Sequence, residues 1–150
     1  MLEAVDLVFA YGKRTVLDGI SLRVAAGEVV SLLGPNGSGK STLLKLLLGI
    51  QRPSRGEVRL DGVPLRRIPP RDYARKVAYV PQLHAALFPY AVLDVVLMGR
   101  LPHRALLSAY TKEDRRLALE ALDWLGLAHL AQRPYTELSG GERQQVPPVP

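Results

Sequence analysis

The alternation of apolar and polar residues predicts β-structure in the first part of the chain. Residues 5–11 carry apolar side chains at every second position and end at Gly12, which is typical of a strand with one apolar face. Residues 20–24 alternate in the same way. A hairpin is predicted over residues 57–65, where Asp61 and Gly62 separate two short arms. The chain therefore begins with antiparallel strands.

Two uninterrupted apolar runs, residues 29–33 and 77–80, predict buried strands. The first run leads directly into a glycine-rich stretch, and residues 40–48 then contain good helix formers with no helix breaker before Gly49. The second run ends at Pro81 and follows a short helix predicted to end near residue 76. Strand, glycine-rich loop and helix therefore follow one another in that order.

The second half of the chain has a helical pattern from residue 83 onward. Residues 91–98 predict one helix and residues 127–132 a short one. Thr111 is the expected N-cap of a longer helix that ends at Gly126. We expect one buried face on that longer helix, formed by Leu117, Ala121, Trp124 and Leu125.

Composition indicates a globular chain of one-domain size. Of its 150 residues, 47% are hydrophobic and 23% charged, and 20 Lys and Arg against 14 Asp and Glu give a net charge of +6. The basic residues are scattered, so we expect no nucleic-acid partner. The absence of cysteine excludes disulfides and thiolate metal sites. The acidic residues at the start of the chain argue against a signal peptide. The apolar runs are too short for a helix that spans a membrane.

The glycine-rich loop, residues 34–42, fits the pattern G-x-x-x-x-G-K-[ST]. Its glycines let successive backbone N–H groups turn toward phosphate oxygens, and the helix that follows adds its dipole. We expect Lys40 to reach the β- and γ-phosphates, Ser41 to bind Mg²⁺ and Thr42 to contact the α-phosphate of a nucleotide. The alternative is a plain turn between strand and helix, which the flanking pattern disfavours. The phosphate-binding residues are Gly34, Pro35, Asn36, Gly37, Ser38, Gly39, Lys40, Ser41 and Thr42.

Three other positions each allow two interpretations. Tyr11 is either an ordinary aromatic at a strand end or a platform for a purine base. Gln82 is either a surface glutamine or a ligand-facing residue just beyond a buried strand. Ser139 forms a predicted capping box with Glu142, which marks either a capped surface helix or a second anion-binding helix end.

Taken together, the loop and the stretch Leu138–Glu142 resemble two motifs of the nucleotide-binding subunits of ATP-binding cassette (ABC) transporters, the Walker A loop and the signature motif. The resemblance implies an α/β P-loop fold with an N-terminal antiparallel β subdomain, a partial RecA-like core and a helical signature subdomain. Residues 1–146 would form this nucleotide-binding domain, with the helical subdomain at about 83–138. Residues 147–150 would be a proline-rich tail outside the family pattern.

The resemblance also implies a role for each motif residue. Tyr11 would stack on adenine, and Gln82 would touch Mg²⁺ or the attacking water. Ser139 and Gly141 would bind the γ-phosphate of ATP held by a second copy of the chain, arranged head to tail. Lys40 and Gln82 would serve hydrolysis, and the cofactors would be ATP and Mg²⁺. The partners would be integral membrane permease subunits, with the chain at the cytoplasmic face of the membrane.

A finer resemblance covers residues 98–104 and 113–115, which are similar to the ATPases of importers for iron-siderophores, haem, cobalamin and other metal chelates. In such importers the membrane and binding-protein subunits contact the transported substrate. We therefore expect no residue of this chain to select the chelate.

The resemblance ends near residue 146. The family's Walker B carboxylates, D-loop and switch histidine have no counterpart in these 150 residues. We therefore expect this chain to bind nucleotide at best. Strands 29–33 and 77–80 would lack their neighbouring strands in the sheet, which implies marginal stability of the fold.

Two alternative functions remain: a non-catalytic fragment that binds nucleotide or dimerises, and a soluble ABC protein of DNA repair or translation. For a repair protein we would expect a coiled-coil or zinc insertion, and the sequence has neither heptads nor cysteines.

Overall fold

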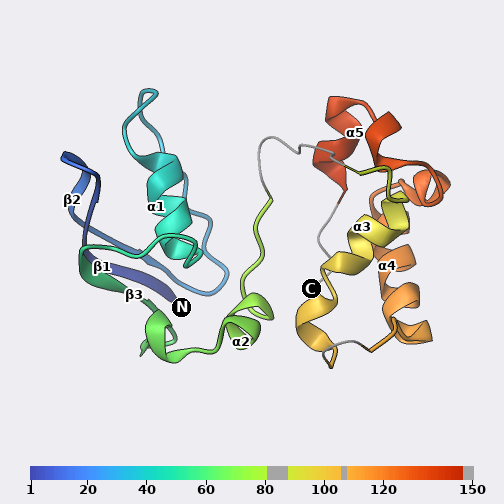
Figure 1. Cartoon of the computed structure of the whole chain (residues 1–150), viewed down its shortest axis with the longest axis horizontal. Coiled ribbons are helices and arrows are strands. Elements are labelled where there is room, and N and C mark those ends of the chain that lie inside the picture. The colour runs from blue at the N-terminus through green and yellow to red at the C-terminus, as the bar shows by residue number, and fades with distance from the viewer. Residues whose placement is uncertain (81–87, 106–107, 147–150) are drawn as a thin grey trace. The chain divides into compact units, whose positions relative to one another are not determined.

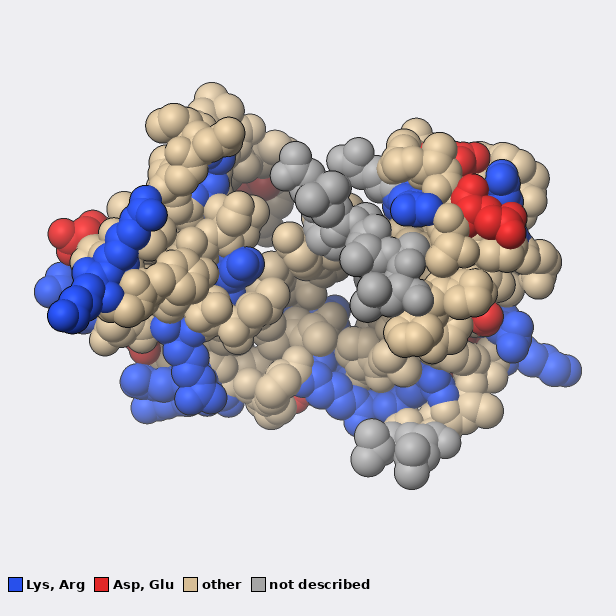
Figure 2. All heavy atoms as spheres, turned by 45° about the horizontal axis from the view of Figure 1, so that its top comes forward, with Lys and Arg blue, Asp and Glu red and all other residues tan. Residues whose placement is uncertain are grey.

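The computed structural model describes residues 1–80, 88–105 and 108–146. The chain divides into two compact units, Met1–Tyr73 and Ala74–Pro150 (Figure 1). Each unit has its own apolar core. Figure 2 shows Lys and Arg side chains spread over the surfaces of both units.

The first unit is built on a four-stranded antiparallel sheet. Its strands are β1 (Leu2–Tyr11), β2 (Arg14–Val24), β3 (Arg55–Leu60) and β4 (Val63–Pro64), in the spatial order β2-β1-β3-β4. The predicted antiparallel start of the chain and the predicted hairpin are thus confirmed. Helix α1 (Lys40–Leu47) contributes Leu43 and Leu46 to the core that it shares with β1 and β2.

A bulge in β1 locks the centre of this sheet. Asp6 has a left-handed backbone with φ 49°, and its N–H donates to Ser21 Oγ at 3.0 Å. A Cβ on Gly56 would lie 2.2 Å from the carbonyl oxygen of Asp6, so only glycine fits opposite the bulge. Arg55 on β3 pairs with the Asp6 carboxylate at 2.8 Å. The bulge therefore holds β3 tightly against β1.

Helix α2 (Pro70–Ala74) follows the short turn η1 (Leu65–Arg67). Its Tyr73 is buried, and the Tyr73 hydroxyl donates a hydrogen bond to the carbonyl of Leu47. Burial raises the pKa of Tyr73 above its usual value. Because Leu47 is the last residue of α1, this bond satisfies one of the carbonyls that a helix end leaves unpaired.

The second unit is helical, as predicted. It contains α3 (Val92–Met98), α4 (Lys112–Trp124) and α5 (Gly140–Gln145), with short 3₁₀ turns η2 (Leu101–His103), η3 (Ala128–Leu130) and η4 (Tyr135–Glu137). The first N–H groups of α3 donate to the carbonyls of Arg133 and Ala131 at 3.0 and 2.9 Å, which ties α3 to the segment before η4. No helix in the described part of the chain is long and apolar enough to cross a membrane.

The two buried strands predicted over residues 29–33 and 77–80 are not formed in the structure. Val29 and Leu33 are 92% and 91% exposed, and Tyr79 and Val80 are also exposed. A strand exists through its hydrogen-bond ladder, and the ladders among the described strands β1–β4 include neither segment. Both predictions were wrong because an apolar run needs neighbouring strands before it can become β-structure.

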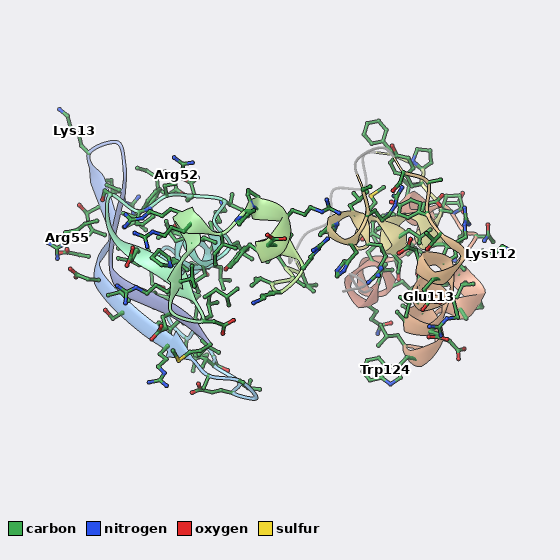
Figure 3. The ribbon with its side chains drawn as sticks, turned by 90° about the horizontal axis from the view of Figure 1, so that it is seen from below. Lys13, Arg52, Arg55, Lys112, Glu113 and Trp124 are labelled. Carbon is green, nitrogen blue, oxygen red and sulfur yellow. The ribbon has the colours of Figure 1, made fainter. Side chains whose placement is uncertain are left out.

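The predicted buried face of α4 was also wrong at two of its four positions, Trp124 and Leu125, and Leu125 is 38% exposed. The helix buries Ala118 and Leu122, with Leu117 and Ala121 partly buried beside them. Trp124 is 86% exposed, and Figure 3 shows it projecting from the end of the helix. The actual core-facing stripe is therefore centred one residue further along the helix than the stripe expected from the sequence.

Helix α4 begins with the predicted N-cap, Thr111, in a capping box with Asp114. Asp114 Oδ2 accepts from the Thr111 N–H at 3.0 Å and from Thr111 Oγ1 at 2.7 Å, and Asp114 Oδ1 accepts from Arg100 Nε at 3.1 Å. These hydrogen bonds, those from Thr111 foremost, lower the pKa of Asp114 from 3.8 to about 2. The folded state therefore favours the ionised carboxylate.

The sign of this shift sets a pH dependence of stability. Because the folded pKa lies below the unfolded value, the Asp114 carboxylate stabilises the fold above about pH 4, and this contribution is lost as the pH falls toward 2. We expect Asp114→Asn to lower the midpoint of thermal unfolding at pH 7, and the gap to the wild type to close between pH 4 and pH 2. Circular dichroism melts across this range measure it. The exposed Asp123→Asn on the same helix is the control, and a gap that persisted at pH 2 would contradict the assignment.

Candidate functional site

The glycine-rich loop joins the exposed segment 29–33 to helix α1, and three of its glycines have a left-handed backbone. Gly34, Gly37 and Gly39 have φ of 154°, 82° and 90°. A Cβ on Gly34 would also lie 3.0 Å from Ser38 Oγ, so a side chain there would crowd the loop from inside. These glycines give the loop the tight curl that the sequence predicted.

The ammonium group of Lys40 holds the curl closed. Lys40 Nζ donates to the carbonyls of Gly34 and Pro35 at 2.7 and 2.8 Å and lies 3.4 Å from Ser38 Oγ. All of these partners are neutral, and no described acidic side chain forms an ion pair with Lys40. The loop therefore holds a positive charge whose compensation must come from solvent or from a bound anion.

Helix α1 starts at Lys40, and no side chain caps its N-terminus. The first N–H groups of a helix have no partner within the helix, so those of Lys40, Ser41 and Thr42 are available to an acceptor beside the loop. Ser41 is exposed, which leaves its hydroxyl accessible, whereas Thr42 is buried at 8% exposure. Lys40 and the helix N-terminus thus add their positive charges at one place.

Close packing fixes the loop against the sheet. A Cβ on Gly39 would lie 2.8 Å from Leu17 Cδ2 and 3.2 Å from the carbonyl oxygen of Val16, both on β2. The start of α1 therefore touches β2 only because residue 39 has no side chain. Figure 1 shows the loop before α1 and the turn between β1 and β2 at the same end of the first unit.

Tyr11 lies at that end of the sheet, on the face that α1 covers. Phe9 and Leu17 pair across β1 and β2, and both are buried in the core with Leu43 of α1. Tyr11 is two residues beyond Phe9, so the two side chains share a face, and their rings meet edge to face at 4.9 Å and 85°. Tyr11 remains 47% exposed. The structure thus supplies a supported aromatic ring at the loop end of the hairpin, which either sequence interpretation of Tyr11 would allow.

The sequence interpretation overlooked Arg14. Its Cα is paired directly with that of Tyr11 across the turn, so both side chains lie on the same face of the hairpin. Arg14 is exposed, and no ion pair with a described residue involves it. The signal was present in the sequence, because a two-residue turn at Gly12 and Lys13 places residues 11 and 14 opposite each other.

The predicted capping box at Ser139 is present at the start of α5. The Glu142 N–H donates to Ser139 Oγ at 3.3 Å, and Glu142 Oε2 accepts from the Ser139 N–H at 2.7 Å. Hydrogen bonds from the Ser139 side chain and, next, from its backbone N–H stabilise the Glu142 carboxylate and lower the pKa of Glu142. Gly140 and Gly141 have open space where a side chain would stand. These residues belong to the second unit.

Gln82 lies outside the described residues, so its predicted role stays a prediction. Among the residues that the structure describes, no cluster of three or more His, Cys, Asp or Glu side chains could hold a metal ion. The exposed Ser41 hydroxyl suits a cation that is also held by a bound phosphate, which is how Mg²⁺ usually binds with nucleotides. The left-handed glycines, the uncompensated charge of Lys40 and the uncapped helix fit the phosphates of a nucleotide.

Comparison with known proteins agrees with this geometry. Residues 17–147 match the family described as ABC transporter. The chain is 44% identical to an ABC transporter ATP-binding protein of Haemophilus influenzae over 97% of its own length and 56% of the relative's. It is 44% identical to the hemin import ATP-binding protein HmuV of Gloeobacter violaceus, of which it covers 52%. It is 37% identical to the iron(3+)-hydroxamate import ATP-binding protein FhuC of Bacillus subtilis, of which it covers 54%.

Solved structures give the same result. The chain superposes on a metal-chelate type ABC transporter in an inward-facing conformation with a TM-score of 0.77 at 37% identity, covering 97% of this chain and 52% of that one. It superposes on a nucleotide-free ATP-binding cassette with a TM-score of 0.82 at 28% identity, covering 97% and 62%. The chain thus spans about half the length of the curated relatives it matches, and by both sequence and fold it belongs to the ABC transporter family.

Proposed function

We propose that this chain binds MgATP through the glycine-rich loop, as part of the ATP-binding subunit of an ABC importer. The observation that carries the proposal is the ammonium of Lys40, which the loop holds among neutral carbonyls without a described carboxylate partner. A buried or partly buried cation without a counter-ion is costly unless an anion binds there. The triphosphate of ATP is an anion of the required charge and shape.

In this proposal each residue of the site has one task. Asn36, Gly37 and Gly39 would present backbone N–H groups to the β-phosphate. Lys40 would neutralise the β- and γ-phosphates, and Thr42 would lie nearest the α-phosphate. Ser41 would hold Mg²⁺, which supplies charge neutralisation of the phosphates when it is bound. Tyr11 would stack on the adenine ring. Gln82 would contact Mg²⁺ or the attacking water.

The second unit would act on a nucleotide held by another copy of the chain. Ser139 and Gly141 would bind its γ-phosphate, and the open space at Gly140 and Gly141 leaves room for such an approach. A head-to-tail pair of chains would therefore enclose ATP. Integral membrane permease subunits would be the further partners, with the chain at the cytoplasmic face of the cell membrane.

The relatives named for hemin and iron(3+)-hydroxamate import favour a metal chelate as the transported substrate. They also favour an importer over a soluble protein of DNA repair or translation. Among the described residues, however, the site is built for phosphate, so selection of the chelate would belong to other subunits. Co-purification with a permease encoded beside this chain would test the assignment.

A matched pair of lysine variants tests the loop. Lys40→Ala should weaken MgATP binding about 10- to 100-fold, because hydrogen bonds to charged groups contribute about 1.5–3 kcal/mol each. Lys45→Ala, at an exposed position in the last turn of the same helix, should bind like the wild type. Isothermal titration calorimetry measures both. Equal affinities for Lys40→Ala and Lys45→Ala would remove the assignment.

Tyr11 can be tested through its ring and its hydroxyl separately. Stacking contributes about 0.5–1.5 kcal/mol, so Tyr11→Ala should lose several-fold in ATP affinity. Tyr11→Phe keeps the ring and its edge-to-face contact with Phe9, and should lose little. Binding of a fluorescent ATP analogue measures the difference. A loss for Phe as large as for Ala would point to the hydroxyl or to folding instead of stacking.

Hydrolysis by the 150-residue chain alone is expected to be absent. The described acidic residues near the motifs lie in helices or in the capping box of Ser139, and none of them ends a strand beside the loop. Loss of a general base commonly costs about 10²- to 10⁴-fold in rate. Phosphate release by the purified chain should therefore equal that of Lys40→Ala. Turnover that disappears in Lys40→Ala would show that another carboxylate, for example Glu142, acts as the base.

A further inference from the structure

We propose that Arg14 is a second phosphate-binding cation of the site, which acts from the β1–β2 hairpin opposite Lys40 and lets the site distinguish nucleotides from nucleosides. The inference rests on the proposed binding of ATP by the glycine-rich loop. The juxtaposition that carries it is the pairing of Arg14 with Tyr11 on the face of the hairpin that α1 covers.

The strand register fixes the side of the hairpin on which Arg14 lies. Residues paired directly across an antiparallel ladder put their side chains on the same face. Phe9 and Leu17 are such a pair, and both are buried in the core that contains Leu43 of α1. Tyr11 contacts Phe9 edge to face, which shows that the same face continues to the end of β1. Arg14, the partner of Tyr11, therefore lies on this face too.

Arg14 also lies at the right distance from the loop. The backbone of Gly39 touches Val16 and Leu17, so the loop meets β2 two to three residues beyond Arg14. The register shifts between the Phe9–Leu17 and Ala10–Thr15 pairs, so only two residue steps of β1 separate the partner of Leu17 from the partner of Arg14. At about 3.3 Å per residue, Arg14 lies roughly 7 Å beyond Leu17 toward the turn. Lys40 follows directly after Gly39. A ligand with its base on Tyr11 and its terminal phosphates at Lys40 would run past the Arg14 side chain.

The chemistry of Arg14 suits a phosphate. Its guanidinium offers a planar fork of N–H donors that matches two phosphate oxygens, and it stays protonated at any physiological pH. Arg14 is exposed and forms no ion pair with the described residues. Arg55, by contrast, is engaged by Asp6 at 2.8 Å. Of these two arginines on the first sheet, Arg14 is the one that can meet a phosphate.

Lys13 provides a matched control. It is the neighbouring residue, carries the same charge and is also exposed. Figure 3 shows Lys13 at the tip of the hairpin, projecting away from the unit. A general attraction of ATP by positive charge would be weakened equally by loss of Lys13 or Arg14, whereas a direct contact with phosphate would depend on Arg14 alone.

The experiment compares Arg14→Gln with Lys13→Gln in binding MgATP, MgADP and adenosine, measured by calorimetry. We expect Arg14→Gln to lose about tenfold or more in affinity for both nucleotides and to bind adenosine like the wild type. Lys13→Gln should stay within about twofold of the wild type for all three ligands. Arg14→Lys should recover part of the loss, since it keeps the charge without the fork.

Three results would overturn the inference. They are an unchanged nucleotide affinity in Arg14→Gln, an equal loss for adenosine, or an equal loss in Lys13→Gln. Thermal unfolding of each variant checks the fold, and Arg14→Lys replaces Arg14→Gln as the decisive variant if Arg14→Gln is unfolded.

The binding of ATP by Lys40→Ala is measured in parallel. If Lys40→Ala loses ATP while Arg14→Gln does not, only this inference fails, and if neither loses ATP, the proposed function fails.

Discussion

The structure of the site depends on the hydrogen bonds between the Lys40 ammonium and the carbonyls of Gly34 and Pro35. They close a loop whose glycines alone would leave it with many conformations, because glycine loses more backbone entropy on ordering than any other residue. The same ammonium gives the loop its net positive charge. One side chain thus shapes the loop and determines what the loop attracts, and a bound phosphate would compete with the two carbonyls for its protons.

The sheet matters to this site because it sets the distance between the loop and the hairpin end. Gly39 rests against β2, so any side chain at position 39 would push α1 away from the strand that carries Arg14. The bulge at Asp6 and the tight approach of Gly56 hold the other side of β1. The positions of Tyr11 and Arg14 relative to Lys40 are therefore set by backbone packing within the first unit, and flexible side chains contribute only the final contacts.

Local signals in the sequence predicted the antiparallel strands, the helix after the glycine-rich loop, the N-cap at Thr111 and the capping box at Ser139, because hairpins and caps are determined by residues a few positions apart. They did not predict that residues 29–33 and 77–80 would lack β-structure, since a strand depends on distant neighbours. Trp124 and Leu125 were wrongly predicted to be buried because the apolar spacing along this helix fits two adjacent stripes almost equally well. Arg14 was overlooked because its meaning comes from strand register and not from a motif. The roles of Gln82, Ser139 and Gly141 stay predictions.

In the proposed function, residues 34–42 bind the triphosphate of ATP. Titration of the isotope-labelled chain with MgATP, followed by amide NMR, tests it most directly, because each backbone N–H reports its own surroundings. We expect saturable shifts concentrated at five residues of the loop and helix start, with smaller shifts near Tyr11; the five residues are Gly37, Gly39, Lys40, Ser41 and Thr42. Inorganic triphosphate should shift the loop signals in the same way and leave those near Tyr11 unchanged. Saturable shifts elsewhere that leave the amide signals of residues 36–42 unmoved would contradict this assignment.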